Sequence, residues 1–236
     1  MKRATMILLV FILVYAIFEI IRVKMLISRA NKLVVQSKPY EQSQAKPRYR
    51  VLIIGDSTGV GTGVSSPEKS LAGLLGAEFP EAEIINRSIN GLRSDQLAES
   101  LESLPESKFN LVIIHIGGND LIRFKSLRKV QSNIKLVLDY ASNRSDKVAL
   151  FTTGDLSKTS FFPLAARPWY GNSSSRLRSS MKKLATEYDN VAYIDLFSYP
   201  DLSEINGYAV DGLHLNDAGY GLWYKALKDT IKKPLF

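Results

Sequence analysis

One serine, one histidine and one aspartate in this chain have the residue types and the setting of a nucleophile with its activating base. Ser57 follows the short apolar run of residues 50–55, so we expect its hydroxyl just beyond the end of a strand. A serine hydroxyl is a weak nucleophile until a neighbouring base takes its proton. A turn or helix-capping serine is the alternative interpretation, because serine is common at both places.

His214 is the candidate base, and Asp211 is its candidate partner. The two lie three residues apart around Gly212. At this spacing the carboxylate can reach Nδ1 of the imidazole, fix its tautomer and stabilise the imidazolium. An ordinary turn ahead of a helix would show the same Asp-Gly-Leu-His sequence. The other histidine, His115, lies inside an apolar run, and we expect it to be a hydrogen-bonded core residue.

Gly91 and Asn119 are candidate donors for an oxyanion hole. Together with the backbone N–H of Ser57, the Gly91 N–H and the Asn119 side-chain amide could stabilise the negative charge of a tetrahedral intermediate. Removal of one such donor costs about 3 kcal/mol of transition-state stabilisation. The alternative is that the Gly-Gly-Asn-Asp segment 117–120 is a strand-end turn in which Asn119 binds its own backbone.

The composition argues against several other chemistries. The chain has no Cys and only two His, so it offers no thiolate nucleophile, no disulfide and a poor ligand set for a metal. The glycine-rich stretch 55–63 lacks the Lys-Ser/Thr ending of a P-loop and the spacing of a dinucleotide-binding loop. We therefore expect no metal and no cofactor.

The segments between these residues alternate between strand and helix patterns. Apolar runs predict five strands, at 50–55, 82–89, 110–116, 147–152 and 190–195. Helices are expected at 66–79 with Ser66 as its cap, from 94, at 127–142, at 175–188 and at 217–233. This alternation predicts an α/β fold, with a five-stranded parallel sheet covered on both faces. Ligands bind beyond the carboxyl ends of such strands, which is where the candidate residues stand.

The net charge of +8 lies outside the expected catalytic domain. Residues 1–50 contain ten of the 31 basic side chains and two of the 23 acidic ones, and the remaining residues contain 21 of each sign. A neutral domain has no electrostatic footprint for a polyanion, so the charge distribution argues against nucleic-acid binding.

Residues 4–21 form an 18-residue apolar run with a single charged side chain, Glu19. At about 1.5 Å per residue, a helix of this length nearly spans the hydrocarbon core of a bilayer. We predict a single-pass membrane anchor with a basic flank in residues 1–35. A signal peptide cleaved near Ala16 and a buried or interfacial helix are the alternatives, but the apolar run continues past Ala16.

The charges beside the apolar run bear on its orientation. Five basic residues follow it within residues 22–38, and only Lys2 and Arg3 precede it. The positive-inside rule therefore favours a domain on the cytoplasmic face, with the periplasmic or other extracytoplasmic side as the alternative.

Residues 36–49 are polar and contain two prolines, which predicts a tether without a packed core before a catalytic domain at 50–236.

The candidate catalytic residues lie in four short motifs, and the order of these motifs along the chain indicates a family. These are Gly55-Asp56-Ser57, then Gly91, then Gly117-Gly118-Asn119-Asp120, then Asp211-Gly212-Leu213-His214. In this order they closely resemble the SGNH (GDSL-type) hydrolase family, over about residues 50–232. The resemblance implies a flavodoxin-like three-layer fold without metal or organic cofactor.

Carried over by motif, the resemblance also implies a role for each candidate residue. Ser57 would be the nucleophile, and His214 would be the base that Asp211 orients. Ser57, Gly91 and Asn119 would form the oxyanion hole. Thr58 stands where many members have Leu or another apolar residue, a departure that bears on the substrate rather than on the mechanism.

The longest irregular segment, 154–172, follows the fourth expected strand and should lie over the site. We expect Phe161, Phe162 and Trp169 of this segment, together with Thr58, to form an acyl or leaving-group pocket. A loop packed on the surface is the alternative interpretation.

The predicted function is that of a serine esterase which hydrolyses a small or lipid acyl ester, as lysophospholipases, thioesterases and arylesterases do, through an acyl-enzyme. Its partners would be the ester substrate and the membrane. A carbohydrate O-acyl (O-acetyl) esterase acting on envelope glycans is the main alternative. A catalytically silent, membrane-tethered binding module is the third, because a fold does not choose its function.

Overall fold

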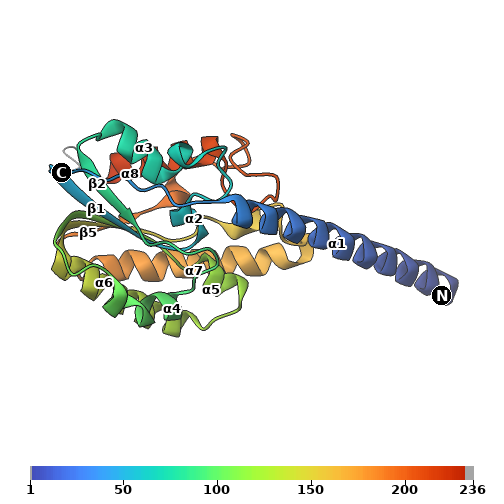
Figure 1. The fold of residues 1–236 in the computed structure, drawn as a ribbon. Helices are drawn as coiled ribbons and strands as arrows, with labels where there is room; N and C mark the ends of the chain where they lie inside the picture. The colour runs from blue at the N-terminus through green and yellow to red at the C-terminus, as the bar shows by residue number, and fades with distance from the viewer. Residues whose placement is uncertain (1, 232–236) are drawn as a thin grey trace.

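Five short apolar segments form the strands of one parallel sheet in the computed structural model, which describes residues 2–231 (Figure 1). The strands are β1 (Tyr49–Gly55), β2 (Ala82–Asn86), β3 (Phe109–His115), β4 (Ser145–Phe151) and β5 (Val191–Ile194). Their order in the sheet is β2-β1-β3-β4-β5, and all four neighbouring pairs are parallel. The predicted five-stranded parallel sheet is confirmed.

Each central strand buries both of its faces, because successive side chains of a strand point to opposite sides of the sheet. On β1, Leu52 and Ile54 pack into one core, while Val51 and Ile53 pack into the other. The first core lies under α4 (Ser94–Glu99), α6 (Leu127–Arg144) and α7 (Arg167–Ala185). The second lies under α3 (Leu71–Glu78) and α8 (Asp217–Thr230), so the molecule has three layers.

Two short helices and five 3-10 turns lie between these elements. The short helices are α2 (Ser57–Val60) and α5 (Gly118–Ile122). The 3-10 turns are η1 (Pro67–Lys69), η2 (Leu101–Ser103), η3 (Leu156–Lys158), η4 (Leu164–Ala166) and η5 (Leu196–Ser198). Each short helix begins within three residues of the end of a strand. They carry the candidate catalytic residues Ser57 and Asn119.

Two helix starts differ from the sequence prediction. The helix expected from Ser66 begins only after Ser70, whose Oγ accepts a hydrogen bond from Gly73 N, and Pro67 instead starts the turn η1. Helix α7 begins at Arg167 rather than 175, with Pro168 in its first turn. Pro is well placed there because the first turn of a helix needs no N–H from it. The end of the segment expected to be irregular is therefore helical.

Within the expected tether, residues 36–49, Gln42 pairs with the open edge of β2. Gln42 and Ile84 exchange two backbone hydrogen bonds, at 3.0 and 2.8 Å. The Gln42 side chain also donates to the carbonyl of Ala82 at 2.7 Å. An edge strand presents unpaired backbone groups, and an extended polar segment can satisfy them.

The N-terminal segment is one helix, α1 (Lys2–Gln36), that projects beyond the end of the domain (Figure 1). It is long and apolar enough to cross a membrane, as a signal sequence would also be. Side chains from Met6 to Ile21 are mostly exposed, whereas the following turns lie against the domain and bury Leu26. The expected basic flank is thus a continuation of the same helix.

Candidate active site

A sharp turn at the end of β1 presents Ser57. Gly55 approaches β3 so closely that a Cβ there would lie 1.9 Å from the carbonyl oxygen of His115, and its φ is +139°. Only glycine accommodates both constraints. Asp56 N donates to that same carbonyl at 2.9 Å, and Asp56 Oδ1 accepts from Thr58 N at 3.0 Å. These bonds fix the backbone on both sides of Ser57.

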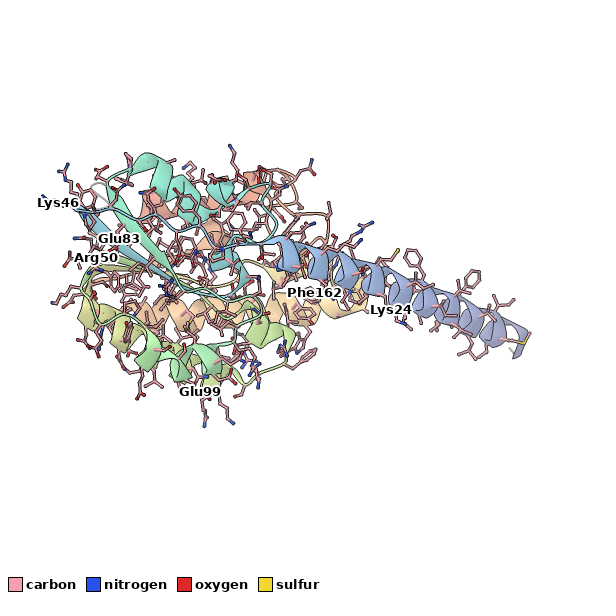
Figure 2. The ribbon with its side chains drawn as sticks, in the orientation of Figure 1. Lys24, Lys46, Arg50, Glu83, Glu99 and Phe162 are labelled. Carbon is pink, nitrogen blue, oxygen red and sulfur yellow. The ribbon has the colours of Figure 1, made fainter. Side chains whose placement is uncertain are left out.

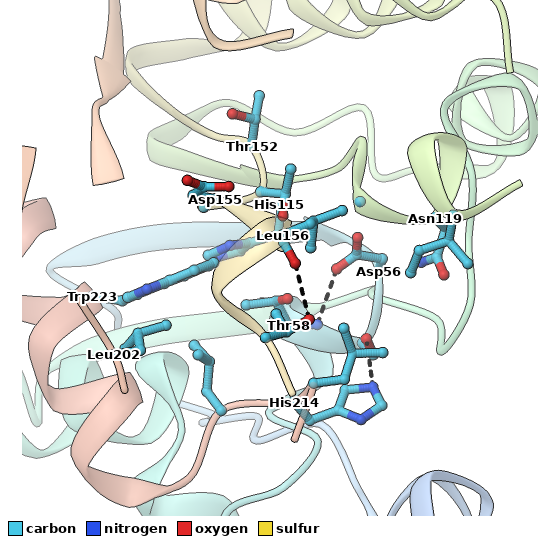
Figure 3. A pocket seen from close by; sticks show the side chains of 18 of the residues that line it. Asp56, Thr58, His115, Asn119, Thr152, Asp155, Leu156, Leu202, His214 and Trp223 are labelled. Carbon is cyan, nitrogen blue, oxygen red and sulfur yellow. Dashed lines mark hydrogen bonds between the residues drawn. The ribbon is translucent and has the colours of Figure 1, made fainter. Parts of the chain in front are cut away.

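The structure brings together the three residues predicted as nucleophile, base and partner. His214 Nε2 lies 3.2 Å from Ser57 Oγ (Figure 3). On the other side of the ring, His214 Nδ1 lies 2.5 Å from Asp211 Oδ2. Asp211 is fully buried, while the His214 side chain is only 12% exposed. The imidazole therefore bridges a hydroxyl and a carboxylate, as a general base with an orienting partner must.

Asp211 is held as a carboxylate by its neighbours. Burial alone would raise the pKa of its carboxyl group, but the hydrogen bond and charge of His214 lower that pKa. The backbone N–H groups of Leu213 and His214 add to this, because both donate to Asp211 Oδ1 at 3.1 Å. The net effect is a pKa below the ordinary value, which keeps the negative charge that stabilises an imidazolium.

Asn119 lines the same cavity as Ser57, and one bond ties it to the segment of Gly91. Its Nδ2 donates to the carbonyl of Leu92, the residue after Gly91, at 3.1 Å. A side-chain amide has two hydrogens, so one remains for an oxyanion. Gly91 has a φ of +76° and open space around its Cα. The oxyanion role of these residues stays a prediction: Asn119 lines the cavity, whereas Gly91 is not among the residues that line it.

Asp120 holds together two of the loops that carry the site. Its carboxylate accepts from Ser94 N at 3.0 Å and from Ser94 Oγ at 2.7 Å. Ser94 is the first residue of α4, so this carboxylate joins the start of α4 to α5. Burial raises the pKa of its carboxyl group, and the two Ser94 bonds only partly oppose this effect.

A cavity of about 100 Å³ adjoins the triad. Ser57, Thr58, Asn119 and His214 line its catalytic side, and its other side is lined by residues that include His115, Thr152, Leu202, Tyr208 and Trp223 (Figure 3). A neighbouring cavity of about 230 Å³ shares five lining residues with it, namely Gly154, Asp155, Leu202, Tyr208 and Trp223. These residues therefore lie between the catalytic cavity and a larger space.

The aromatic residues predicted for the pocket lie elsewhere, and of the four predicted pocket residues Thr58 alone lines the cavity. Phe162 is buried in the core under α7, where its ring stacks on Tyr170 with 3.7 Å between centroids, and Phe161 packs against that core. Trp169 is 41% exposed and contacts Phe124. These three side chains lie outside the lining of this cavity, so their role in a pocket stays a prediction.

His115 is buried without the hydrogen bonds that the sequence led us to expect. Among residues 2–231, no polar group pairs with either ring nitrogen. Its ring stacks on Phe151, with centroids 4.4 Å apart, and lies parallel to Trp223 at 6.0 Å. Burial lowers the pKa of His115 to about 3. His115 is thus a neutral ring in the cavity wall, which leaves His214 as the candidate base.

The sequence profile of the GDSL-like lipase/acylhydrolase family matches residues 53–222. This chain belongs to that family. The matched residues include Ser57, Asn119 and the Asp211–His214 pair. Membership of this lipase and acylhydrolase family makes the protein an ester-hydrolysing serine hydrolase.

Solved structures share the GDSL-like fold at low sequence identity. The structure of TesA matches with a TM-score of 0.63 and 23% identity, over 79% of this chain and 99% of TesA. The acetylxylan esterase Axe2 from Geobacillus stearothermophilus gives 0.63 and 18%, over 82% and 98%. The psychrotrophic esterase EstA from Pseudoalteromonas sp. gives 0.60 and 21%, over 78% and 97%. A search of curated proteins finds no match.

Several residues of this GDSL-like site were missed in the sequence. Thr152 directly follows β4, so the rule that ligands bind at carboxyl ends of strands could have found it. Leu202, Tyr208 and Trp223 come from a long connection and a helix, where no local pattern distinguishes wall residues from core residues. Among the described residues, no three His, Asp or Glu side chains gather as a metal site.

Proposed function

We propose that this hydrolase cleaves small acyl esters with Ser57 as nucleophile, His214 as general base and Asp211 as its orienting partner. The observation that carries the proposal is the position of the His214 ring, 3.2 Å from Ser57 Oγ on one side and 2.5 Å from Asp211 on the other. A histidine in this position can take the serine proton and keep its own charge stabilised.

The reaction would proceed in two balanced steps. Ser57 Oγ attacks the ester carbonyl while its proton moves to His214 Nε2, and the collapsing intermediate releases the alcohol, which receives that proton. Water then loses a proton to His214 and attacks the acyl-enzyme. As the second intermediate collapses, His214 returns this proton to Ser57 Oγ, and the carboxylic acid and free Ser57 are released. The Asn119 amide, with the N–H groups of Ser57 and Gly91, would stabilise the oxyanion in both steps.

The size of the catalytic cavity supports a small acyl group. Its volume of about 100 Å³ is enough for several water molecules. We expect an acyl group of a few carbons to fit, and a long chain to require the neighbouring space behind Leu202 and Tyr208.

Two measurements test this proposal. A fluorophosphonate probe should label the wild type but not Ser57→Ala, while Ser132→Ala, a matched change on the exposed face of α6, should label normally. A series of p-nitrophenyl esters should show the highest kcat/KM at two to four carbons. Labelling that persists in Ser57→Ala, or a preference for long chains, would contradict the respective part of the proposal.

A carbohydrate O-acetyl esterase is the second candidate, and the small cavity favours it as much as it favours other short esters. An acetyl group is the smallest acyl group that such a cavity would take. Release of acetate from acetylated oligosaccharides, compared with release from acetylated lipids at equal concentration, separates the two substrates.

We further propose that α1 is a retained membrane anchor. The helix runs without interruption through Ala16, where a signal peptide would be cut, and its later turns pack on the domain. The basic residues after the apolar run support a cytoplasmic domain. The mass of the mature chain tests the anchor. Protease digestion of intact and opened vesicles tests the orientation, and the glycan substrate would require the opposite side.

A further inference from the structure

The two halves of α1 have different surroundings. Its apolar half, Ala4–Ile21, is almost entirely exposed, whereas its second half turns a regular stripe toward the domain. The stripe recurs every three or four residues, as one face of a helix does. Its members are Val23, Leu26, Ala30 and Leu33. The anchor therefore does not swing freely above the catalytic domain but continues into a helix that packs on it.

Three polar contacts fix where α1 lies. The Arg22 guanidinium donates to the carbonyl of Ser160, and that of Arg29 donates to the carbonyl of Val210 at 3.1 Å. Just after the helix, Ser37 Oγ accepts from Asn90 Nδ2 at 2.9 Å. Val210 precedes Asp211 of the triad, and Asn90 precedes Gly91. The helix thus binds the segments that carry the catalytic residues, all at the carboxyl ends of the strands.

Exposed apolar side chains gather at this same end of the molecule. In the described chain after α1, seven large apolar side chains are exposed, and six of them belong to segments that leave the carboxyl ends of strands. We call five of these the apolar rim: Ile89, Phe124, Leu164, Trp169 and Val210. Phe124 and Trp169 contact each other with 4.6 Å between centroids, so they form one aromatic surface.

The contacts also set the height of the site above the apolar run. Arg22 is the first basic residue after that run, so its bond to Ser160 places the segment after β4 where the run ends. Eight residues separate Ile21 from Arg29, which is about 12 Å of helix. The polar layer on each side of a bilayer is about 5–8 Å thick. With the apolar run spanning the hydrocarbon core, as proposed above, these contacts would place the triad at or just above the headgroups.

We propose that the apolar rim rests on the bilayer surface and that the catalytic site opens toward it, so that the enzyme cleaves small acyl esters carried by membrane-bound amphiphiles. The proposal rests on the esterase function and the retained anchor proposed above. The small acyl group would enter the cavity, and the amphiphile would be the leaving alcohol. An ester buried at the level of the lipid tails would be out of reach.

Charges around the apolar rim support a phospholipid surface as its partner. Exposed Arg123 and Lys125 flank Phe124, and Lys24 and Lys32 are exposed on the docked half of α1. Basic side chains near a membrane surface each gain about 1 kcal/mol from anionic headgroups. Apolar and basic groups together are what an interfacial surface requires.

The contact with lipid can be measured without any hydrolysis. The chain has no cysteine, so Phe124→Cys, Leu164→Cys and Leu136→Cys each allow one fluorescent label on the full-length protein. Leu136 is a matched control because it is similarly exposed, at 54%, but lies on α6 away from the rim. In vesicles with anionic phospholipid and headgroup nitroxide, labels at 124 and 164 should be quenched at least twofold more than the label at 136. Equal quenching, or a chain that does not enter vesicles, would overturn the proposal.

Hydrolysis in the same vesicles tests the substrate class. We expect the pair Phe124→Asn and Leu164→Asp to lower kcat/KM for an acetylated headgroup lipid by about tenfold, which corresponds to 1.4 kcal/mol. Hydrolysis of soluble p-nitrophenyl acetate should stay within twofold, and Leu136→Asp should change neither. Asn suits position 124 because its φ there is +54°.

The outcomes separate this inference from the proposed function. A wild type that does not cleave p-nitrophenyl acetate contradicts the esterase mechanism, whatever the labels report. Equal losses on the lipid ester and the soluble ester, with normal cleavage by the wild type, contradict the membrane-facing site alone.

Discussion

The two ends of the sheet differ in the kinds of residue that surround them. At the amino ends of the strands, Arg50 pairs with Glu83 at 2.7 Å, and Arg50 N donates to Asn110 Oδ1 at 2.9 Å. Figure 2 shows Lys46, Arg50 and Glu83 together at this end, with Phe162 and Lys24 toward the opposite one. At the carboxyl ends lie the triad, the apolar rim and the helix α1.

The carboxyl ends also hold the features that cost stability. The buried His115 ring finds no hydrogen-bond partner among residues 2–231, Asp56 has a pKa raised by burial to about 6, and Phe124 has a positive φ. Each of these is unfavourable for folding by itself, and such features cluster where a site needs them. The amino ends show ordinary ion pairs and strand starts instead. Stability and chemistry are thus divided between the two ends.

The largest loss of activity should follow substitution of a triad residue. Ser57→Ala or His214→Ala should lower kcat by about 10⁴-fold or more, because the nucleophile and base act as one unit. The thermal unfolding midpoint should change little, since both side chains border a cavity. Steady-state hydrolysis of p-nitrophenyl acetate checks this, and retention of more than a tenth of the activity would contradict the assigned roles.

The next largest effect should come from the oxyanion donor. Asn119→Ala should lower kcat by about 10²–10³-fold and leave KM nearly unchanged, because the oxyanion forms only in the transition state. Asn119→Asp is a matched change of the same size that should be at least as harmful. A rise in KM at constant kcat would instead indicate that Asn119 binds the ground state.

A smaller effect concerns the stability of the folded protein at low pH, to which His115 contributes. The folded pKa of His115 is about 3 against 6.5 for an ordinary histidine, so between these values the unfolded chain binds a proton that the folded chain does not. Stability should therefore fall as the pH falls below 6.5, by up to about 1.4 kcal/mol per pH unit. His115→Phe should remove this contribution to the pH dependence of stability.

Asp56 contributes with the opposite sign. Its folded-state pKa is raised to about 6, so between about pH 6 and 3.8 the folded state binds the proton more tightly and stability rises as the pH falls.

Urea denaturation of the wild type and His115→Phe at several pH values checks the sign. The difference between the two unfolding free energies should move in favour of the variant as the pH is lowered from 7 to 4. A difference that stays constant would mean that His115 is solvated or paired in the folded protein.

The smallest effect should come from the amino ends. Arg50→Met should change the free energy of unfolding by less than about 1 kcal/mol, because the Arg50–Glu83 pair is partly exposed. Activity should be unchanged, since this residue lies at the other end of the sheet from Ser57. A loss of activity in Arg50→Met would contradict the inference that activity depends only on the carboxyl ends of the strands.

The local part of the site could be predicted from the sequence, since its signals lie within a few residues of one another. Asp211 and His214 are three residues apart, and Ser57 directly follows a strand pattern. The central strands were predictable for a related reason: both of their faces are buried, so β1 and β3 contain the apolar runs Val51–Ile54 and Leu111–Ile114.

What the sequence did not predict depends on distant pairings. His115 was expected to have a hydrogen bond, but its ring meets Trp223, more than a hundred residues later. The docking of α1 on Ser160 and Val210 likewise joins residues that no local periodicity connects. The burial of Phe162 in the core under α7 was not predicted either, because a sequence cannot show which way a chain turns after a strand.

The pairing of Gln42 with Ile84 has a practical consequence for shortened forms of the protein. A chain that began at residue 50 would lack both the membrane helix and the segment that covers β2. Its edge strand would then offer free backbone groups to a second molecule, which favours edge-to-edge aggregation. A chain that began near Ser37 would lose the apolar helix but keep this cover. The choice of starting residue should therefore decide whether a soluble form stays monodisperse.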